Sequence, residues 1–144
     1  MSTLSILTRR TSAPINDVCA RLPEIAQQHK FGLLGIHDLK EKMAAKGLTF
    51  DRECRVFEVC NPQQAHDILT GDITVSAALP CRISVYADGK GTALSTIDPL
   101  ALLGLFGGNS AEEARIAKDV KTTLLAIMDE ACGAPAKAGE SPQS

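Results

Sequence analysis

The chain has 144 residues, of which 44% are hydrophobic and 22% charged, and its formal net charge is −2. This length is that of one domain and is sufficient for a hydrophobic core. Its lysines and arginines are spread out, and it has four Phe, one Tyr and no Trp. The basic face with aromatic stacking platforms that is typical of nucleic-acid binding is therefore missing, and we expect no nucleic-acid partner.

The sequence also gives an expectation about location. No apolar run approaches the roughly 20 residues that span a bilayer, so we expect no membrane partner. The N-terminus places Arg9 and Arg10 after a short apolar stretch, the reverse of a signal peptide. Five cysteines at irregular spacings, without a CxxC pair, argue against a disulfide framework. We therefore expect a cytoplasmic protein with reduced thiols.

The first third of the chain predicts strands and helices in alternation. Strands are expected over residues 3–9 and 31–37, which are rich in β-branched and aliphatic residues. Between them, apolar residues recur at helical spacing over 15–26 and predict a helix with one buried stripe. Asp38 is the expected N-cap of a short helix, which Gly47 ends.

The middle third continues this alternation. A third strand is expected over residues 53–59. Asn61 supplies an N-cap and Pro62 the first residue of a helix that stops at Gly71. Residues 73–79 fit either a short helical turn or an irregular apolar crossing, and the sequence does not choose between them.

A hairpin and an apolar segment follow. Strands are predicted over residues 81–87 and 92–97, with a turn at Asp88-Gly89-Lys90-Gly91. The apolar connection over residues 100–106 is hard to leave in water on so small a domain. We therefore expect it to form part of an interface between two copies of the chain.

The last helix begins at Ser110, with Glu113 in the capping-box position, and Gly133 ends it. Residues 134–144 have the composition of a flexible tail. The element order β-α-β-α-β-α-β-β-α predicts one α/β (α+β) domain over residues 1–133. Its expected architecture is a two-layer mixed sheet of about five strands, with helices mainly on one face.

Cys60 is the leading candidate for chemistry. It stands at the end of a predicted strand, one residue before the helix cap Asn61. A helix N-terminus carries partial positive charge and free N–H groups, which lower the pKa of a nearby thiol. The resulting thiolate is a nucleophile and a metal ligand. The alternative is a small buried residue that fills a strand-to-helix corner.

Two further residues are candidate partners of Cys60. Cys81 opens the next strand, and the two thiols can approach if their strands are neighbours. Alternation also groups Cys81 with Ile83 and Val85, which favours core packing. His37 ends a strand, where loops often carry ligands, and histidine is the commonest metal ligand. Its alternative is a surface or capping role.

Glu58 shares a strand face with Cys54, Val56 and Cys60. This half-polar face suits a ligand pocket, a partner subunit or a partly exposed sheet, so Glu58 is a candidate ligand-binding residue. Cys54 lies about 20 Å from Cys60 on an extended strand, which excludes joint ligation of one ion within one chain.

Several motifs resemble one known family. They are Phe31-Gly32, His37-Asp38-Leu39-Lys40-Glu41-Lys42, Arg55-Val56-Phe57-Glu58-Val59-Cys60-Asn61-Pro62, Ala65, Leu79-Pro80-Cys81-Arg82-Ile83, Val85-Tyr86 and Asp98-Pro99. In order and spacing over about residues 3–131, the chain resembles the domain of unknown function 302 family. The resemblance implies a compact two-layer α/β domain that assembles as a homodimer. It places Cys60 and Cys81 on two cysteine motifs, whereas Cys54 is outside the family pattern, and it names no reaction.

Three hypotheses of function follow. The first is a cytoplasmic homodimeric binding module that holds a soft ligand at Cys60, with Cys81 or His37 as second ligand. That ligand is a transition metal, haem iron or sulfane sulfur, all of which suit thiolates. The second is an enzyme that uses Cys60 in thiol redox or sulfur-transfer chemistry. The third is a structural or interaction domain without a small ligand.

Overall fold

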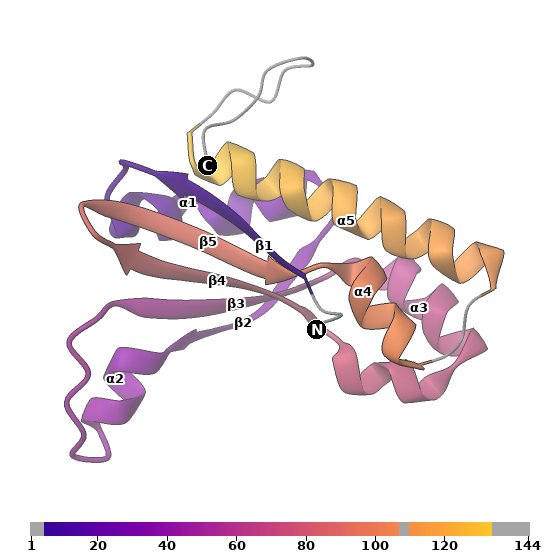
Figure 1. Cartoon of the computed structure of the whole chain (residues 1–144), viewed down its shortest axis with the longest axis horizontal. Coiled ribbons are helices and arrows are strands. Elements are labelled where there is room, and N and C mark those ends of the chain that lie inside the picture. The colour runs from indigo at the N-terminus through magenta and orange to yellow at the C-terminus, as the bar shows by residue number, and fades with distance from the viewer. Residues whose placement is uncertain (1–4, 107–109, 134–144) are drawn as a thin grey trace.

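The computed structural model of the chain describes residues 5–106 and 110–133, which form a sheet and a set of helices (Figure 1). The predicted tail at 134–144 and the first residues of the predicted N-terminal strand lie outside the described residues. The strands are β1 (Ile6–Thr11), β2 (Gly32–Asp38), β3 (Cys54–Cys60), β4 (Cys81–Asp88) and β5 (Gly91–Ile97). The helices are α1 (Ile15–Gln28), α2 (Leu39–Ala44), α3 (Pro62–Gly71), α4 (Pro99–Leu103) and α5 (Ala111–Ala131), with short 3₁₀ helices η1 (Ile73–Ala78) and η2 (Gly104–Phe106).

Helices α2, α3 and α5 begin where the sequence predicted, whereas α4 lies in a segment predicted as an apolar connection. The side chains of Asp38, Asn61 and Ser110 accept a backbone N–H in the first turns of α2, α3 and α5, and the capping box of Ser110 and Glu113 is formed. These contacts satisfy N–H groups that have no partner inside a helix. The ambiguous segment after α3 is the 3₁₀ helix η1.

The sheet has five strands in the order β1-β5-β4-β3-β2. The α/β fold with five strands is confirmed. All four neighbouring pairs in the described residues are antiparallel, so the prediction that strand directions are mixed is wrong. The reason is the path of the chain: β1, α1 and β2 form a crossover between strands of the same direction, but this crossover joins opposite edges of the sheet. No parallel neighbours result.

The largest buried cluster, called here the sheet core, lies between one face of the sheet and two helices. Helix α1 and the C-terminal part of α5 cover that face (Figure 1). Its members come from α1, α5, the three central strands and Phe31 before β2, and they include Leu22, Phe57, Ile83 and Met128. Arg9 of β1 also reaches α5, where its Nε donates to Asp129 Oδ1 over 2.7 Å.

A second buried cluster, called here the helical cluster, lies beyond the end of the sheet. Its members are Ile68 of α3, Val75 of η1, Leu103 of α4, and Ile116 and Ala117 of α5. In Figure 1, α3 and α4 lie beside the N-terminal part of α5, away from the covered sheet face. Helix α5 therefore belongs to both clusters, one at each end.

The apolar segment over residues 100–106 is partly buried. Leu103 belongs to the helical cluster and Phe106 packs against it, while Leu105 is 60% exposed. The expectation that the whole segment lies exposed is therefore wrong, because α5 covers it. Other exposed apolar residues include Leu34 on β2, Leu48 and Phe50 after α2, and Ile73 on η1. No helix among residues 5–106 and 110–133 is long and apolar enough to cross a membrane.

Candidate functional site: an apolar cavity with two thiols

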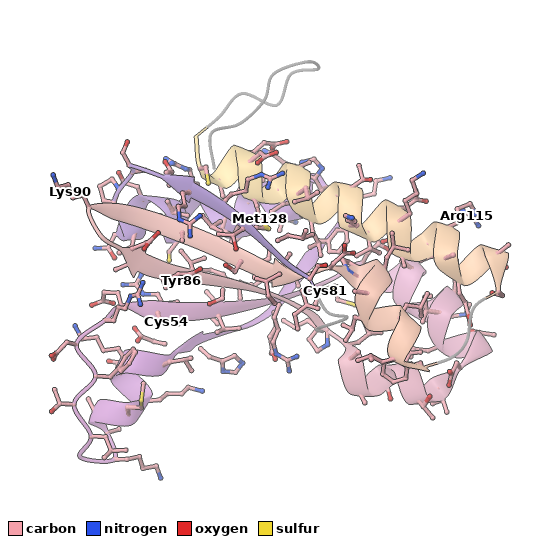
Figure 2. The ribbon with its side chains drawn as sticks, in the orientation of Figure 1. Cys54, Cys81, Tyr86, Lys90, Arg115 and Met128 are labelled. Atoms are coloured by element: carbon pink, nitrogen blue, oxygen red, sulfur yellow. The ribbon has the colours of Figure 1, made fainter. Side chains whose placement is uncertain are left out.

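Two chain turns bring Cys60 and Cys81 to the same end of the sheet. Strand β3 ends at Cys60, and α3 begins directly after it because Asn61 Oδ1 accepts the Gln64 N–H over 2.9 Å. Cys81 opens β4, and the sheet register pairs it with Val59, the neighbour of Cys60. In Figure 2, Cys81 lies near α4 at this end of the sheet.

A cavity of about 130 Å³ opens between this end of the sheet and the helical cluster. Both Cys60 and Cys81 line it, so the structure brings together two of the predicted site residues. Most of the wall is aliphatic or aromatic. It includes Phe31, Ala65, Ile68, Val75, Leu79, Pro80, Leu102, Leu103, Phe106, Ile116, Ala117 and Leu124.

Burial is the main cause of the pKa shifts of the Cys60 and Cys81 thiols. It raises the pKa of the Cys81 thiol to about 11, with a smaller increase from neighbouring Cys60 and an opposing decrease from Arg82. Burial also raises the pKa of the Cys60 thiol. The prediction of a lowered Cys60 pKa is therefore wrong. An apolar wall disfavours the thiolate, and Asn61 already occupies one of the N–H groups at the start of α3.

The polar side chains of the wall are few. Thr96 Oγ1 donates to the Arg82 carbonyl over 2.7 Å. The guanidinium of Arg82 lies at the surface, with Nη2 3.4 Å from Glu58 Oε2. Gln64 differs from both, because its Oε1 atom is buried and has no hydrogen-bond partner in the described residues. Sequence reasoning missed Gln64, and a glutamine in the first turn of a helix gives no signal of it.

His37 and Glu58 form a separate polar cluster on the uncovered face of the sheet. His37 Nε2 lies 3.2 Å from Glu58 Oε1, and Lys42 Nζ lies 2.9 Å from His37 Nδ1. Gly35 makes room for this pair, since a Cβ there would stand 3.2 Å from Glu58 Oε1. Neither His37 nor Glu58 lines the cavity. Arg82, which does, links the cluster to the cavity rim.

The remaining cysteines are separate from this site. Cys54 pairs with Tyr86 in the sheet register, and its Sγ lies 3.8 Å from Ser84 Oγ. Figure 2 shows Cys54 and Tyr86 far from Cys81 along the sheet. Cys19 is buried in the sheet core, against which Cys132 packs. Among the described residues, no group of three or more His, Cys, Asp or Glu side chains is arranged to hold a metal ion.

The model of the family described as "Domain of unknown function DUF302" matches residues 7–131. The chain belongs to this family. The resemblance seen in the cysteine motifs is thereby confirmed, and Cys60, Cys81 and the cavity wall all lie within the matched span. The family description assigns no activity.

A solved structure supports the same assignment. An uncharacterized conserved DUF302 protein from Bacillus stearothermophilus is 31% identical and superposes with a TM-score of 0.80. The match covers 88% of this chain and 97% of that one. No curated protein matches the chain. The fold and the family are thus established.

Proposed function

We propose that this domain is a binding module for a small apolar ligand, which it holds in the cavity beside Cys60 and Cys81. The observation that carries the proposal is a cavity of about 130 Å³ walled mainly by carbon and sulfur. An engineered apolar cavity of about 150 Å³ in another protein stays dry and binds benzene. The space here suits one aromatic ring or the apolar end of a longer molecule.

The two sulfur atoms give this cavity a soft, polarisable wall. At neutral pH both thiols are mainly protonated, since burial raises the pKa of each. A neutral thiol behaves as a small hydrophobic group, and sulfur makes favourable contacts with aromatic rings. This supports an aromatic or aliphatic ligand ahead of the other soft ligands.

The direct test is a titration with toluene, followed by NMR. We expect toluene to shift the signals of cavity residues such as Ile68 and Ala117. The Ala65→Leu variant should bind toluene at least tenfold more weakly, because its larger side chain occupies the space. Ala114→Leu is the matched control, since Ala114 is exposed on α5. Absence of toluene binding, or equal binding by the Ala65→Leu variant, contradicts the proposal.

A transition metal or haem iron held by Cys60 is the second candidate. Two thiols in one cavity wall favour it, but a metal must displace their protons, and within residues 5–106 and 110–133 no third ligand is grouped with them. His37 was predicted, as an alternative to Cys81, as the second ligand, and it lies in the separate cluster with Glu58. An absorption spectrum and metal analysis of the purified protein distinguish this candidate from the first.

Thiol redox or sulfur transfer at Cys60 is the least favoured of the three, because thiolate is the reactive form and burial makes it scarce. Treatment with polysulfide followed by mass spectrometry tests it. A mass increase of 32 Da per sulfur atom, about the atomic mass of sulfur, mapped to Cys60, would favour the enzyme.

We also propose that the module is a cytoplasmic homodimer. Leu34 and Leu48 are 62% and 60% exposed, and Ile36 of the edge strand β2 is 48% exposed. Exposed apolar side chains on an edge strand are suited to pairing with another chain. All five cysteines are free thiols, as in a reducing compartment. Light scattering should give about twice the 15.3 kDa chain mass, whereas a monomer contradicts the dimer.

A further inference from the structure

We infer that the ligand is an amphipathic carboxylate, whose apolar ring or chain fills the cavity and whose carboxylate is held at the mouth by the guanidinium of Arg82. The inference rests on the proposed function, since it names the chemical class of the ligand for the same cavity. The supporting observation is that the mouth combines a positive charge with exposed apolar surface.

The exposure of the lining residues locates the mouth of the cavity. Of the lining residues that the structure describes, Arg82 of β4 and Ile97 of β5 are exposed, while the others are buried or half-buried. Ser84 pairs with Ser95 in the sheet register, and Arg82 and Ile97 each lie two residues beyond this pair, toward the same end of the sheet. Because side chains alternate between the two faces of a sheet, Arg82 and Ile97 are neighbours on the same face. The cavity therefore opens to solvent at these two residues.

Exposed apolar surface continues from the mouth. Ile6 of β1 pairs with Ile97 in the sheet register, and the two residues are 60% and 40% exposed. Leu100 of α4, which follows Ile97 along the chain, is also exposed. A ligand whose apolar part is longer than the cavity gains free energy by covering this surface where it leaves the wall.

Arg82 gives the mouth a positive charge. No Asp or Glu is among the described residues that line the cavity. Arg82 Nη2 lies 3.4 Å from Glu58 Oε2 outside the cavity, and the arginine side chain remains 56% exposed. Glu58 Oε1 also lies 3.2 Å from His37 Nε2, so Glu58 keeps a partner when Arg82 turns to a ligand. An arginine stem packs along apolar surface while its charged head stays in water, which places the head within reach of a ligand at the mouth.

The guanidinium suits a carboxylate in shape and in charge. Its planar fork of N–H donors matches the two oxygen atoms of a carboxylate. A carboxylate carries one negative charge, as Arg82 carries one positive charge, whereas a phosphate monoester carries nearly two and is repelled by Glu58. An ammonium group is repelled by Arg82. Fatty acids and arylalkanoic acids combine an apolar body with a single carboxylate.

Three probes that share a phenyl ring and a propyl chain separate the possibilities. At pH 7, 3-phenylpropanoate is an anion, 3-phenylpropan-1-ol is neutral and 3-phenylpropylamine is a cation. Each is titrated calorimetrically against the wild-type chain and the Arg82→Met variant, whose side chain is of similar length but uncharged. We expect wild type to bind the carboxylate most tightly and the amine most weakly. In Arg82→Met, carboxylate affinity should fall about fivefold, as for a partly exposed ion pair, and alcohol affinity less than about twofold.

A second variant should change the affinity in the opposite direction. Glu58→Gln removes the anion that competes for Arg82, so carboxylate affinity should rise about twofold while alcohol affinity stays unchanged. Arg10→Met is the matched control, because the Arg10 side chain is also 56% exposed and pairs with a carboxylate, that of Asp88, but does not line the cavity. It should leave the affinities for all three probes unchanged.

Circular dichroism melts verify that each variant is folded. Equal affinity of wild type for the carboxylate and the alcohol, or an equal loss of both in Arg82→Met, overturns the inference. Unchanged carboxylate affinity in Arg82→Met overturns it as well. If wild type binds toluene but not the carboxylate, the inference fails and the proposed function stands. If wild type binds neither, the proposed function itself fails.

Discussion

The two buried clusters of this domain are packed to different degrees. In the sheet core, Leu22, Ile127 and Met128 are 0% exposed. In the helical cluster, every member keeps between 5% and 7% of its surface exposed, from Ile116 to Leu103. The first cluster lies between a sheet and two long helices and reaches the cavity at Phe31 and Leu124, while every member of the second lines the cavity.

This difference separates the part of the domain that stabilises it from the part suited to binding. A protein interior is normally packed as densely as an organic crystal, and an apolar void forfeits van der Waals contacts. The helical cluster consists of short helices joined to α5 and leaves such a void. Cys81 lies at the border, since it packs against the sheet core and lines the cavity.

The largest expected effect comes from truncating each cluster in turn. Leu22→Ala should lower the free energy of unfolding by about 2–5 kcal/mol, because the rigid sheet core leaves a new cavity behind. Leu103→Ala should cost about 1–2 kcal/mol, mainly the transfer term, since Leu103 already borders a void. Urea denaturation of both variants measures this. Equal losses would contradict the comparison.

The second-largest effect on stability is expected at Asp98, a polar residue that connects α4 to α5. Asp98 Oδ1 accepts the Leu100 N–H at the start of α4, and Lys121 Nζ of α5 lies 2.9 Å from Oδ2. Asp98→Ala should cost about 2 kcal/mol of stability and weaken toluene binding, because α4 loses its tie to α5. Asp119→Ala, on the exposed face of α5, is the control. Unchanged toluene binding in Asp98→Ala would show that the cavity does not depend on this anchor.

The raised pKa of the Cys81 thiol predicts that the free energy of unfolding depends on pH. The pKa of its thiol rises from an ordinary 9.0 to about 11 in the fold, so between these values the unfolded chain releases a proton that the folded chain retains. Its contribution to stability is therefore complete below pH 9 and is lost as the pH rises toward 11. We expect wild type to lose about 2 kcal/mol more than Cys81→Ala over this interval. Parallel urea-denaturation curves would show that Cys81 is well solvated.

The smallest effect is expected outside both clusters. His37 contacts Glu58 and Lys42 on the uncovered sheet face. His37→Ala should therefore change the free energy of unfolding by less than about 1 kcal/mol and leave toluene affinity unchanged. Calorimetric titration checks the affinity. A tenfold loss would extend the ligand site from the cavity to the cluster at Glu58, as the sequence had suggested for both residues.

Local signals in the sequence were sufficient to predict most helices and strands of this domain. The caps at Asp38, Asn61 and Ser110 predicted three helix starts, because a cap is a contact between residues three positions apart. The turn between β4 and β5 was predicted for the same reason. The antiparallel direction of all neighbouring strand pairs was not predicted from the sequence. It depends on which edge of the sheet the chain reaches after α1.

The site required long-range contacts that no local pattern encodes. Alternation along β3 placed Glu58 and Cys60 on one face, yet Cys60 lines the cavity and Glu58 pairs with His37. The sequence by itself determined the elements, the family motifs and the position of Cys60 before a helix. Only the tertiary structure decided the partly buried setting of that thiol, since residues of α4 and α5, which are distant in sequence, line the same apolar cavity.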